Sequence, residues 1–214
     1  SIVDEAVEKG CNLIVSHHPL IFRPLKRVVG ADDVQRAVAK AIKHDITILS
    51  MHTNMDNALG GVNFKMAEKM QLTGVKFFTE KQVDGITCGS GVMGELPGAM
   101  AADDFIMMLK REFDVECVQC NQLLRRPIRT VAICGGAGSF LLPEAIAAGA
   151  DAFVTGEMHY HDYFAHEQEI QIAVIGHYQS EQYTYEIFKS IIEEQCEGVR
   201  CVVTSQNTNP IIYL

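Results

Sequence analysis

The chain has 214 residues, of which 48% are hydrophobic and 21% are charged, so a globular protein with a sizeable core is expected. The net charge of -9 argues against a nucleic acid or an anionic membrane as the main partner, because an acidic surface is repelled by both. No apolar stretch approaches the ~20 residues that span a bilayer, and seven cysteines without a framework spacing indicate reduced thiols and a cytoplasmic protein.

Helix-like and strand-like patterns alternate along the chain. The expected helices cover residues 3–10, 32–44, 64–70, 101–113, 141–149 and 180–196, and the expected strands cover 12–16, 46–51, 129–134, 151–156 and 171–176. This alternation is typical of an α/β protein. The predicted fold class is therefore α/β, with duplicated strand–loop–helix units that form mainly parallel sheets.

The duplication is visible in the sequence itself. The segment EAVEKGCNLIVSHH in the first half aligns with EAIAAGADAFVTGE in the second half. When the next predicted strand of each half is aligned through to the histidine that follows it, His52 aligns with His177 and Asp56 aligns with Glu181. We therefore interpret the chain as two related halves.

These halves suggest a division of the chain into three segments. We predict a first α/β half over residues 1–83, a connecting α/β segment over 84–128 and a second α/β half over 129–214. The glycine-rich stretch 84–98 is the expected seam, because clustered glycines favour turns and linkers.

Metal-ligating side chains follow several of the predicted strands, where functional groups gather in parallel α/β sheets. His17 and His18 are adjacent on an extended segment, so they point in different directions and suit two neighbouring ions. His177 and Glu181 are four residues apart at the start of a helix and share one face. Together with Asp56 they form a set of five nitrogen and oxygen donors.

This donor set suits two divalent metal ions per chain, with Zn, Fe, Mn, Co and Ni all left open. Two such ions support hydrolysis of a phosphoester, an amide-like bond or a purine ring. Glu157 and His52 are candidate catalytic residues that orient the ligands or act as a base. The alternative is that the histidines only cap strands, and that Glu157 and His52 are ordinary hydrogen-bonded loop residues.

Two further motifs have both a functional and a structural interpretation. Gly135, Gly136 and Gly138 lie between a strand and a helix, where backbone amides can bind the phosphate of a substrate or cofactor. The alternative is a tight turn, since the spacing is not that of a nucleotide-binding motif. Cys117 and Cys120 form a lone CxxC, for which a structural role is favoured over a redox or zinc pair because no second CxxC follows.

Five ordered motifs, IVSHHPLIF, HTNMDNALGGVN, CGGAGS, VTGEMHYHD and GHYQSE, resemble the Nif-three-like family of dinuclear-metal proteins, whose members are often named type 2 homologues of GTP cyclohydrolase I. The resemblance runs over almost the whole chain and implies a duplicated α/β architecture. It also implies a homo-oligomer, a toroidal hexamer built as a trimer of dimers, with the sites facing an internal cavity. The metal ligands that it implies are His17, His18, Asp56, His177 and Glu181.

Two functions are compatible with these motifs. The first is a metal-dependent hydrolase or cyclohydrolase that acts on a nucleotide or another phosphorylated small molecule. The second is a non-catalytic, metal-binding regulatory or scaffold hexamer that engages another protein. Replacement of His177 or Glu181 by alanine distinguishes them, because a catalyst would lose turnover whereas a scaffold would keep its partner.

Overall fold

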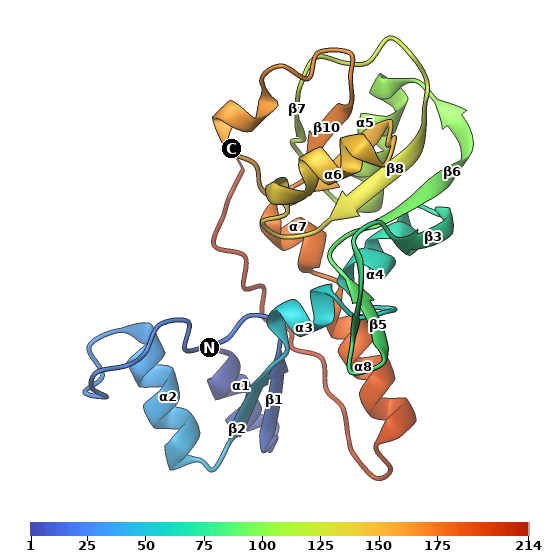
Figure 1. Ribbon diagram of the computed structural model, residues 1–214. Helices are drawn as coiled ribbons and strands as arrows, with labels where there is room; N and C mark the ends of the chain where they lie inside the picture. Colours follow the sequence, from blue (N-terminus) through green and yellow to red (C-terminus); the bar gives the residue numbers. More distant parts are fainter. Residues whose placement is uncertain (214) are drawn as a thin grey trace. The chain divides into compact units, whose positions relative to one another are not determined.

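A six-stranded mixed sheet carries most of the fold in the computed structural model, which describes residues 1–213 (Figure 1). The strand order is β3-β6-β8-β9-β10-β7. Only β8, β9 and β10 run parallel, whereas β3, β6 and β7 pair antiparallel with their neighbours. The bounds are β3 Thr73–Phe77, β6 Val92–Met100, β7 Gln119–Cys120, β8 Ile128–Cys134, β9 Ala152–Thr155 and β10 Gln171–Val174.

The prediction of mainly parallel sheets is therefore wrong for this sheet, and the α/β class itself is confirmed. The glycine-rich stretch expected as a seam contains strand β5 (Ile86–Gly89) and most of β6. Val92, Gly94 and Leu96 are buried at every second position of β6, while Glu95 between them is exposed. This period of two places one face of β6 against the core, and pairing with β8 outweighs the turn preference of the glycines.

The described chain falls into two compact units. Unit 1 comprises Ser1–Met55 and Tyr185–Pro210, and unit 2 comprises Asp56–Thr184 and the last residues from Ile211 onward. Both units are completed by a returning segment of the chain. The predicted division at residues 83 and 128 concerns two repeated halves rather than compact units, and it stays a prediction.

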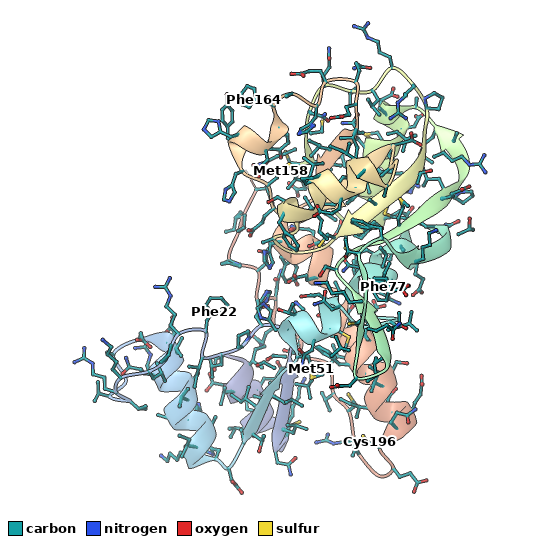
Figure 2. All side chains as sticks on the ribbon, in the orientation of Figure 1. Phe22, Met51, Phe77, Met158, Phe164 and Cys196 are labelled. Carbon is teal, nitrogen blue, oxygen red and sulfur yellow. The ribbon has the colours of Figure 1, made fainter. Side chains whose placement is uncertain are left out.

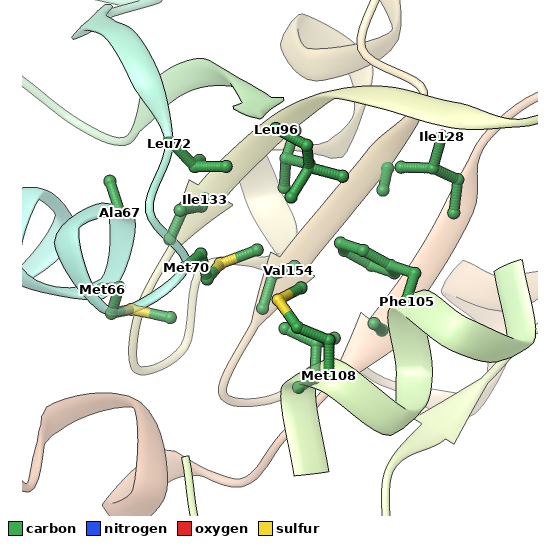
Figure 3. Close-up of a cluster of buried hydrophobic side chains, with 14 of the residues drawn as sticks. Met66, Ala67, Met70, Leu72, Leu96, Phe105, Met108, Ile128, Ile133 and Val154 are labelled. Atoms are coloured by element: carbon green, nitrogen blue, oxygen red, sulfur yellow. The ribbon is translucent and has the colours of Figure 1, made fainter. Parts of the chain in front are cut away.

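The core of unit 2 lies on both faces of the six-stranded sheet. Helices α4 (Val62–Lys69) and α5 (Ala102–Glu112) supply Met66 and Phe105 to a large apolar cluster on one face (Figure 3). Helix α6 (Leu142–Ala147) packs against the smaller cluster on the other face. In the second half of β8, Val131 and Ile133 belong to the first cluster and Ala132 and Cys134 to the second, which explains why these four successive residues are all apolar.

Unit 1 is built on a two-stranded parallel sheet with a small core. The strands are β1 (Leu13–Ser16) and β2 (Thr47–Ser50), and helices α1 (Ile2–Glu8) and α2 (Asp33–Lys43) pack on them through residues such as Val3, Ala6 and Ala41. The helices predicted over 3–10 and 32–44 are confirmed. Helix α2 begins at Asp32, whose carboxylate accepts the Gln35 N–H at 2.8 Å.

A buried carboxylate joins the two ends of unit 1. Glu5 on α1 forms an ion pair with Lys9 at 2.5 Å and accepts hydrogen bonds from Thr204 and from the N–H and hydroxyl of Ser205. The Lys9 ammonium, followed by Thr204 and Ser205, lowers the pKa of Glu5 to about 2. Glu5 therefore stays ionised and holds the returning segment against α1.

Apart from α8, which has 12 residues, the remaining elements are short. They are α3 His52–Asp56, the hairpin strand β4 Glu80–Val83, the 3-10 turns η1 Ser139–Leu141 and η2 Tyr160–Tyr163, and the helices α7 His177–Glu181 and α8 Thr184–Gln195. The helix predicted over 180–196 is thus split between α7 and α8. None of the helices within residues 1–213 is both long and apolar enough to span a membrane. All seven cysteines are free thiols.

The edge strand β7 is held by a buried amide network. Gln171 at the start of β10 has no exposed surface, and its side chain accepts the Leu124 N–H at 3.0 Å and donates to Asn121 Oδ1 at 2.9 Å. The Asn121 side chain in turn accepts the Ile172 N–H and donates to the Ile170 carbonyl, both at 2.9 Å. These bonds tie the loop after β7 to β10, where the ladder itself spans only two residues of β7.

We expect Gln171→Leu to lower the free energy of unfolding by about 2–4 kcal/mol, because it leaves the buried Leu124 N–H without its partner and removes one of the two hydrogen bonds to Asn121 Oδ1. Urea denaturation measures the change. Gln82→Leu is the matched control, since Gln82 lies in the exposed β4–β5 hairpin, where the same substitution should change stability by less than about 0.5 kcal/mol. Equal changes in the two variants would contradict the role of the network.

Candidate functional site

Three histidines gather at the carboxyl end of the unit 1 sheet. His17 and His18 follow β1, and His52 begins α3 directly after β2. The parallel register extends past the strands, because the His52 N–H donates to the His17 carbonyl at 2.8 Å. The ring centroids lie 4.8 Å apart for His17 and His18, 5.6 Å for His17 and His52, and 5.3 Å for His18 and His52.

The first two rings point in different directions, as the extended segment predicts. The ring planes of His17 and His18 make an angle of 77°. His52 adopts a backbone φ of 39°, a left-handed conformation that non-glycine residues rarely occupy, and such strain is often found at functional sites. Phe22, in the loop after β1, lies 6.2 Å from the His52 ring and is largely exposed (Figure 2).

In unit 2, His177 lies between two carboxylates. Its Nδ1 is 2.8 Å from Glu157 Oε1, and its Nε2 is 3.1 Å from Glu181 Oε2. His177 and Glu181 are the first and last residues of α7, so the spacing of four residues brings both side chains to one face. Glu157 reaches the ring from the end of β9, the neighbouring strand in the sheet.

The two carboxylates control the charge of this imidazole. Glu181, and to a smaller extent Glu157, raises the pKa of His177 to about 9 against the opposing effect of burial. In the absence of a metal ion, His177 is therefore a cation between two anions at neutral pH. The two carboxylates hold both nitrogens of the His177 ring in place. The three side chains together carry one excess negative charge.

Asp56 ends α3 and begins unit 2. Its backbone carbonyl accepts a hydrogen bond from Asn63 Nδ2 at 3.0 Å. Burial, followed by the negative charges of Asp56 and Glu181, raises the pKa of the Cys134 thiol to about 12. Cys134 is thus neutral at pH 7, and the donors near the end of β8 are carboxylate oxygens and imidazole nitrogens rather than thiolate.

The glycine-rich turn after β8 is anchored by three side chains. The Gly135 N–H donates to Asn63 Oδ1 at 2.8 Å, the Gly136 N–H to Ser180 Oγ at 2.9 Å and the Gly138 N–H to Thr155 Oγ1 at 3.2 Å. The amides predicted to bind a phosphate thus donate within the protein. Phosphate binding by these glycines stays a prediction. It would require the three N–H groups to break these hydrogen bonds and to donate to the phosphate.

Sequence reasoning did not select the residues that hold this turn, which are Asn63, Thr155 and Ser180. Asn63 and Thr155 are polar residues among apolar neighbours, which is a weak signal in the sequence. Ser180 stands between polar residues and gives no such signal. All three side chains are buried. The CxxC residues Cys117 and Cys120 are exposed; Cys120 lies within the short strand β7, and Cys117 precedes it.

The same local arrangement occurs twice in the described chain. In each, a parallel strand pair is followed by a five-residue helix that begins with histidine and ends with a carboxylate, α3 in the first case and α7 in the second. This is the alignment of His52 with His177 and of Asp56 with Glu181 that the sequence predicted. The equivalent positions after the preceding strands are His17 and His18 in unit 1, and Gly156 and Glu157 in unit 2.

Comparison with known proteins gives a consistent result. The family model described as Duf34/NIF3 (NGG1p interacting factor 3) matches residues 1–210. A Clostridium perfringens protein named GTP cyclohydrolase 1 type 2 homolog is 29% identical over 217 residues, which cover 100% of this chain and 82% of the relative. A Streptococcus pneumoniae protein of the same name is 34% identical over 163 residues, and here the alignment covers 74% of this chain but only 60% of the relative.

Solved structures agree with these sequence matches. The crystal structure of Staphylococcus aureus protein SA1388 superposes with a TM-score of 0.89 at 27% sequence identity, covering 100% of this chain and 84% of that chain. The similarity therefore extends over both units.

We expect the pKa of His177 in chelator-treated wild-type protein to lie near 9. It should be lower in Glu157→Gln and lowest in Glu181→Gln, because each substitution removes a carboxylate that stabilises the imidazolium. NMR titration of the histidine ring signals measures it. Because the folded-state value is raised, this ion pair stabilises the fold below the unfolded value near 6.5 and loses its effect as the pH rises through about 9.

Glu167→Gln is the control for this titration, since Glu167 is an exposed carboxylate of the same unit. Its removal should leave the His177 signal unchanged. A pKa for His177 near 6.5 in the wild type would contradict the arrangement of the two carboxylates.

Proposed function

Since the chain belongs to the Duf34/NIF3 family, we propose that it is a metal-binding protein that holds two divalent ions. The proposed ligands are His17, His18, Asp56, His177 and Glu181. Imidazole nitrogens and carboxylate oxygens suit Zn²⁺, Fe²⁺, Mn²⁺, Co²⁺ and Ni²⁺, whereas the neutral Cys134 thiol offers no competing soft donor. The identity of the ions follows from availability as much as from these donors.

The observation that carries this proposal is the setting of His177. Histidines that bind metals usually offer one ring nitrogen to the ion and donate the other N–H to a carboxylate or carbonyl. In unit 2, Glu157 occupies Nδ1, while Nε2 faces the Glu181 carboxylate 3.1 Å away. The pair formed by Nε2 and Glu181 is thus a nitrogen–oxygen donor set with its orientation already fixed.

Unit 1 supports the proposal independently. Three histidine rings within 5.6 Å of one another, at a strand end, are hard to explain by core packing alone. The 77° between the rings of His17 and His18 fits donation to two different ions. The short helix α3 begins at His52 and ends at Asp56. The Asp56 carboxylate therefore follows the last of the three histidines by only four residues.

We further propose that the ions serve hydrolysis or ring opening of a nucleotide or another phosphorylated small molecule. Divalent ions supply Lewis acidity to such reactions, because they polarise phosphoryl and carbonyl oxygens and acidify water. Relatives named GTP cyclohydrolase 1 type 2 homolog favour this class of substrate. In this proposal Glu157 orients His177, and His52 orients its neighbours or accepts a proton.

The family resemblance also implies a ring-shaped assembly of subunits. We therefore propose a homo-oligomer, a hexamer arranged as a trimer of dimers. Several large apolar side chains are exposed on the described chain, among them Val83 and Ile86 on the β4–β5 hairpin and Phe140 after the glycine-rich turn. Light scattering on purified protein measures the assembly. A monomer at micromolar concentration would contradict the hexamer without affecting the metal ligands.

We expect about two metal ions per chain in protein purified without a histidine tag, measured by elemental analysis. The content should fall in His17→Ala and in Glu181→Ala, which remove ligands proposed from unit 1 and unit 2, respectively. His44→Ala is the matched control, because His44 is an exposed histidine at the end of α2 and should not alter the content. Less than one ion per chain, with none taken up on titration, would refute the metal-binding proposal.

Turnover distinguishes the catalyst from a regulatory scaffold. In a screen of nucleotides, we expect His177→Ala to abolish hydrolysis without altering the oligomer, and Glu157→Gln to weaken metal affinity or activity by about 10–100-fold through the orientation of His177. Wild-type protein that is fully loaded with metal and hydrolyses no member of the screen would favour the non-catalytic scaffold.

A further inference from the structure

We propose that the glycine-rich turn at residues 135–138 positions the metal ligands of unit 2, and that Asn63 and Ser180 connect it to them. The assignment of these residues as metal ligands rests on the proposed function. The contacts of the turn with Asn63 and Ser180 do not depend on that assignment. The turn follows β8, contacts side chains from α4 and α7, and is thereby linked to Asp56, His177 and Glu181.

The first connection runs through Asn63. This side chain is 1% exposed and lies in the first turn of α4. Its Oδ1 accepts the Gly135 N–H at 2.8 Å, and its Nδ2 donates to the Asp56 carbonyl at 3.0 Å. One buried amide thus uses both of its functional groups to set the distance from the turn to the backbone of Asp56.

The second connection runs through Ser180. Its hydroxyl accepts the Gly136 N–H at 2.9 Å and donates to the His177 carbonyl at 2.8 Å. Ser180 lies next to Glu181 in α7. Its hydroxyl therefore fixes the helix that carries the side chains of His177 and Glu181. A Cβ at Gly156 would lie only 2.7 Å from Ser180 Oγ, which shows how closely β9 approaches the same hydroxyl.

The third connection is steric. Gly136 has a φ of 61°, and a Cβ at this position would overlap Glu181 Oε1 and lie 3.6 Å from His177 Cε1. The carboxylate of Glu181 therefore occupies the space that any other residue at position 136 would fill. The absence of a side chain at Gly136 defines where Glu181 can lie.

Gly149 provides a control for the backbone contribution. It also has a positive φ, 77°, but a Cβ there would meet no atom within 4 Å. Replacement by alanine strains the left-handed backbone at both positions, whereas only the change at Gly136 intrudes on Glu181. The difference between the two variants isolates the effect on the ligand.

The experiment titrates Zn²⁺ into chelator-treated wild-type protein, Gly136→Ala, Ser180→Ala and Gly149→Ala by calorimetry, with thermal unfolding of each metal-free sample. We expect Gly136→Ala and Ser180→Ala to weaken Zn²⁺ binding by about 10–100-fold, as supporting residues around a metal usually do. Gly149→Ala should keep wild-type affinity although it also lowers the unfolding temperature. Equal affinities of Gly136→Ala and Gly149→Ala would overturn the positioning role.

A double-mutant cycle tests the contact without any metal. In metal-free protein, we expect Gly136→Ala to lower the unfolding temperature much less when Glu181 has already been shortened by Glu181→Ala, because the overlapping carboxylate is gone. Additive effects would overturn the inference. If the wild type binds no Zn²⁺ but the cycle shows coupling, the proposed function fails while the positioning of Glu181 by the turn stands.

Discussion

Cys134, Thr155 and Val174 are paired in register across the three parallel strands of unit 2, and the arrangement of its polar groups depends on this alignment. Since the three strands end at the same level, the residues that follow them emerge together at one edge of the sheet. The glycine-rich turn, Glu157 and α7 are these following segments. A shift of one strand by a single residue would exchange the two faces of that strand and separate the carboxylates from His177.

Much of this arrangement could be predicted from the sequence, because it depends on local spacing. The four-residue interval between His177 and Glu181 is enough to bring the two side chains to one face of a helix. The alternation of helices and strands likewise follows from short-range periodicity. The mixed sheet could not be predicted in this way, because the direction of β6 depends on pairing with β8, some 35 residues further along the chain.

The role of the glycines was hidden for a similar reason. A glycine-rich turn between a strand and a helix is compatible with phosphate binding and with close packing, and its sequence does not distinguish the two. The close packing is produced by Ser180 and Glu181, 44 and 45 residues beyond Gly136: Ser180 accepts the Gly136 N–H, and Glu181 lies where a Cβ of residue 136 would be. The same motif, CGGAGS, is one of the five through which the sequence resembles the family.

The contact of Glu5 with Thr204 and Ser205 joins residues 199 and 200 positions apart, and this separation has a consequence for synthesis on the ribosome. The elements from α1 to β9 end at Thr155 or earlier, so they leave the exit tunnel before Thr204 and Ser205 are added to the chain. Unit 1 can therefore close only after Thr204 and Ser205 have left the tunnel, whereas the strands of the large sheet other than β10 are available earlier. During translation, Glu5 stays without its contacts to Thr204 and Ser205, so the order of the two events is set by the connectivity of the chain.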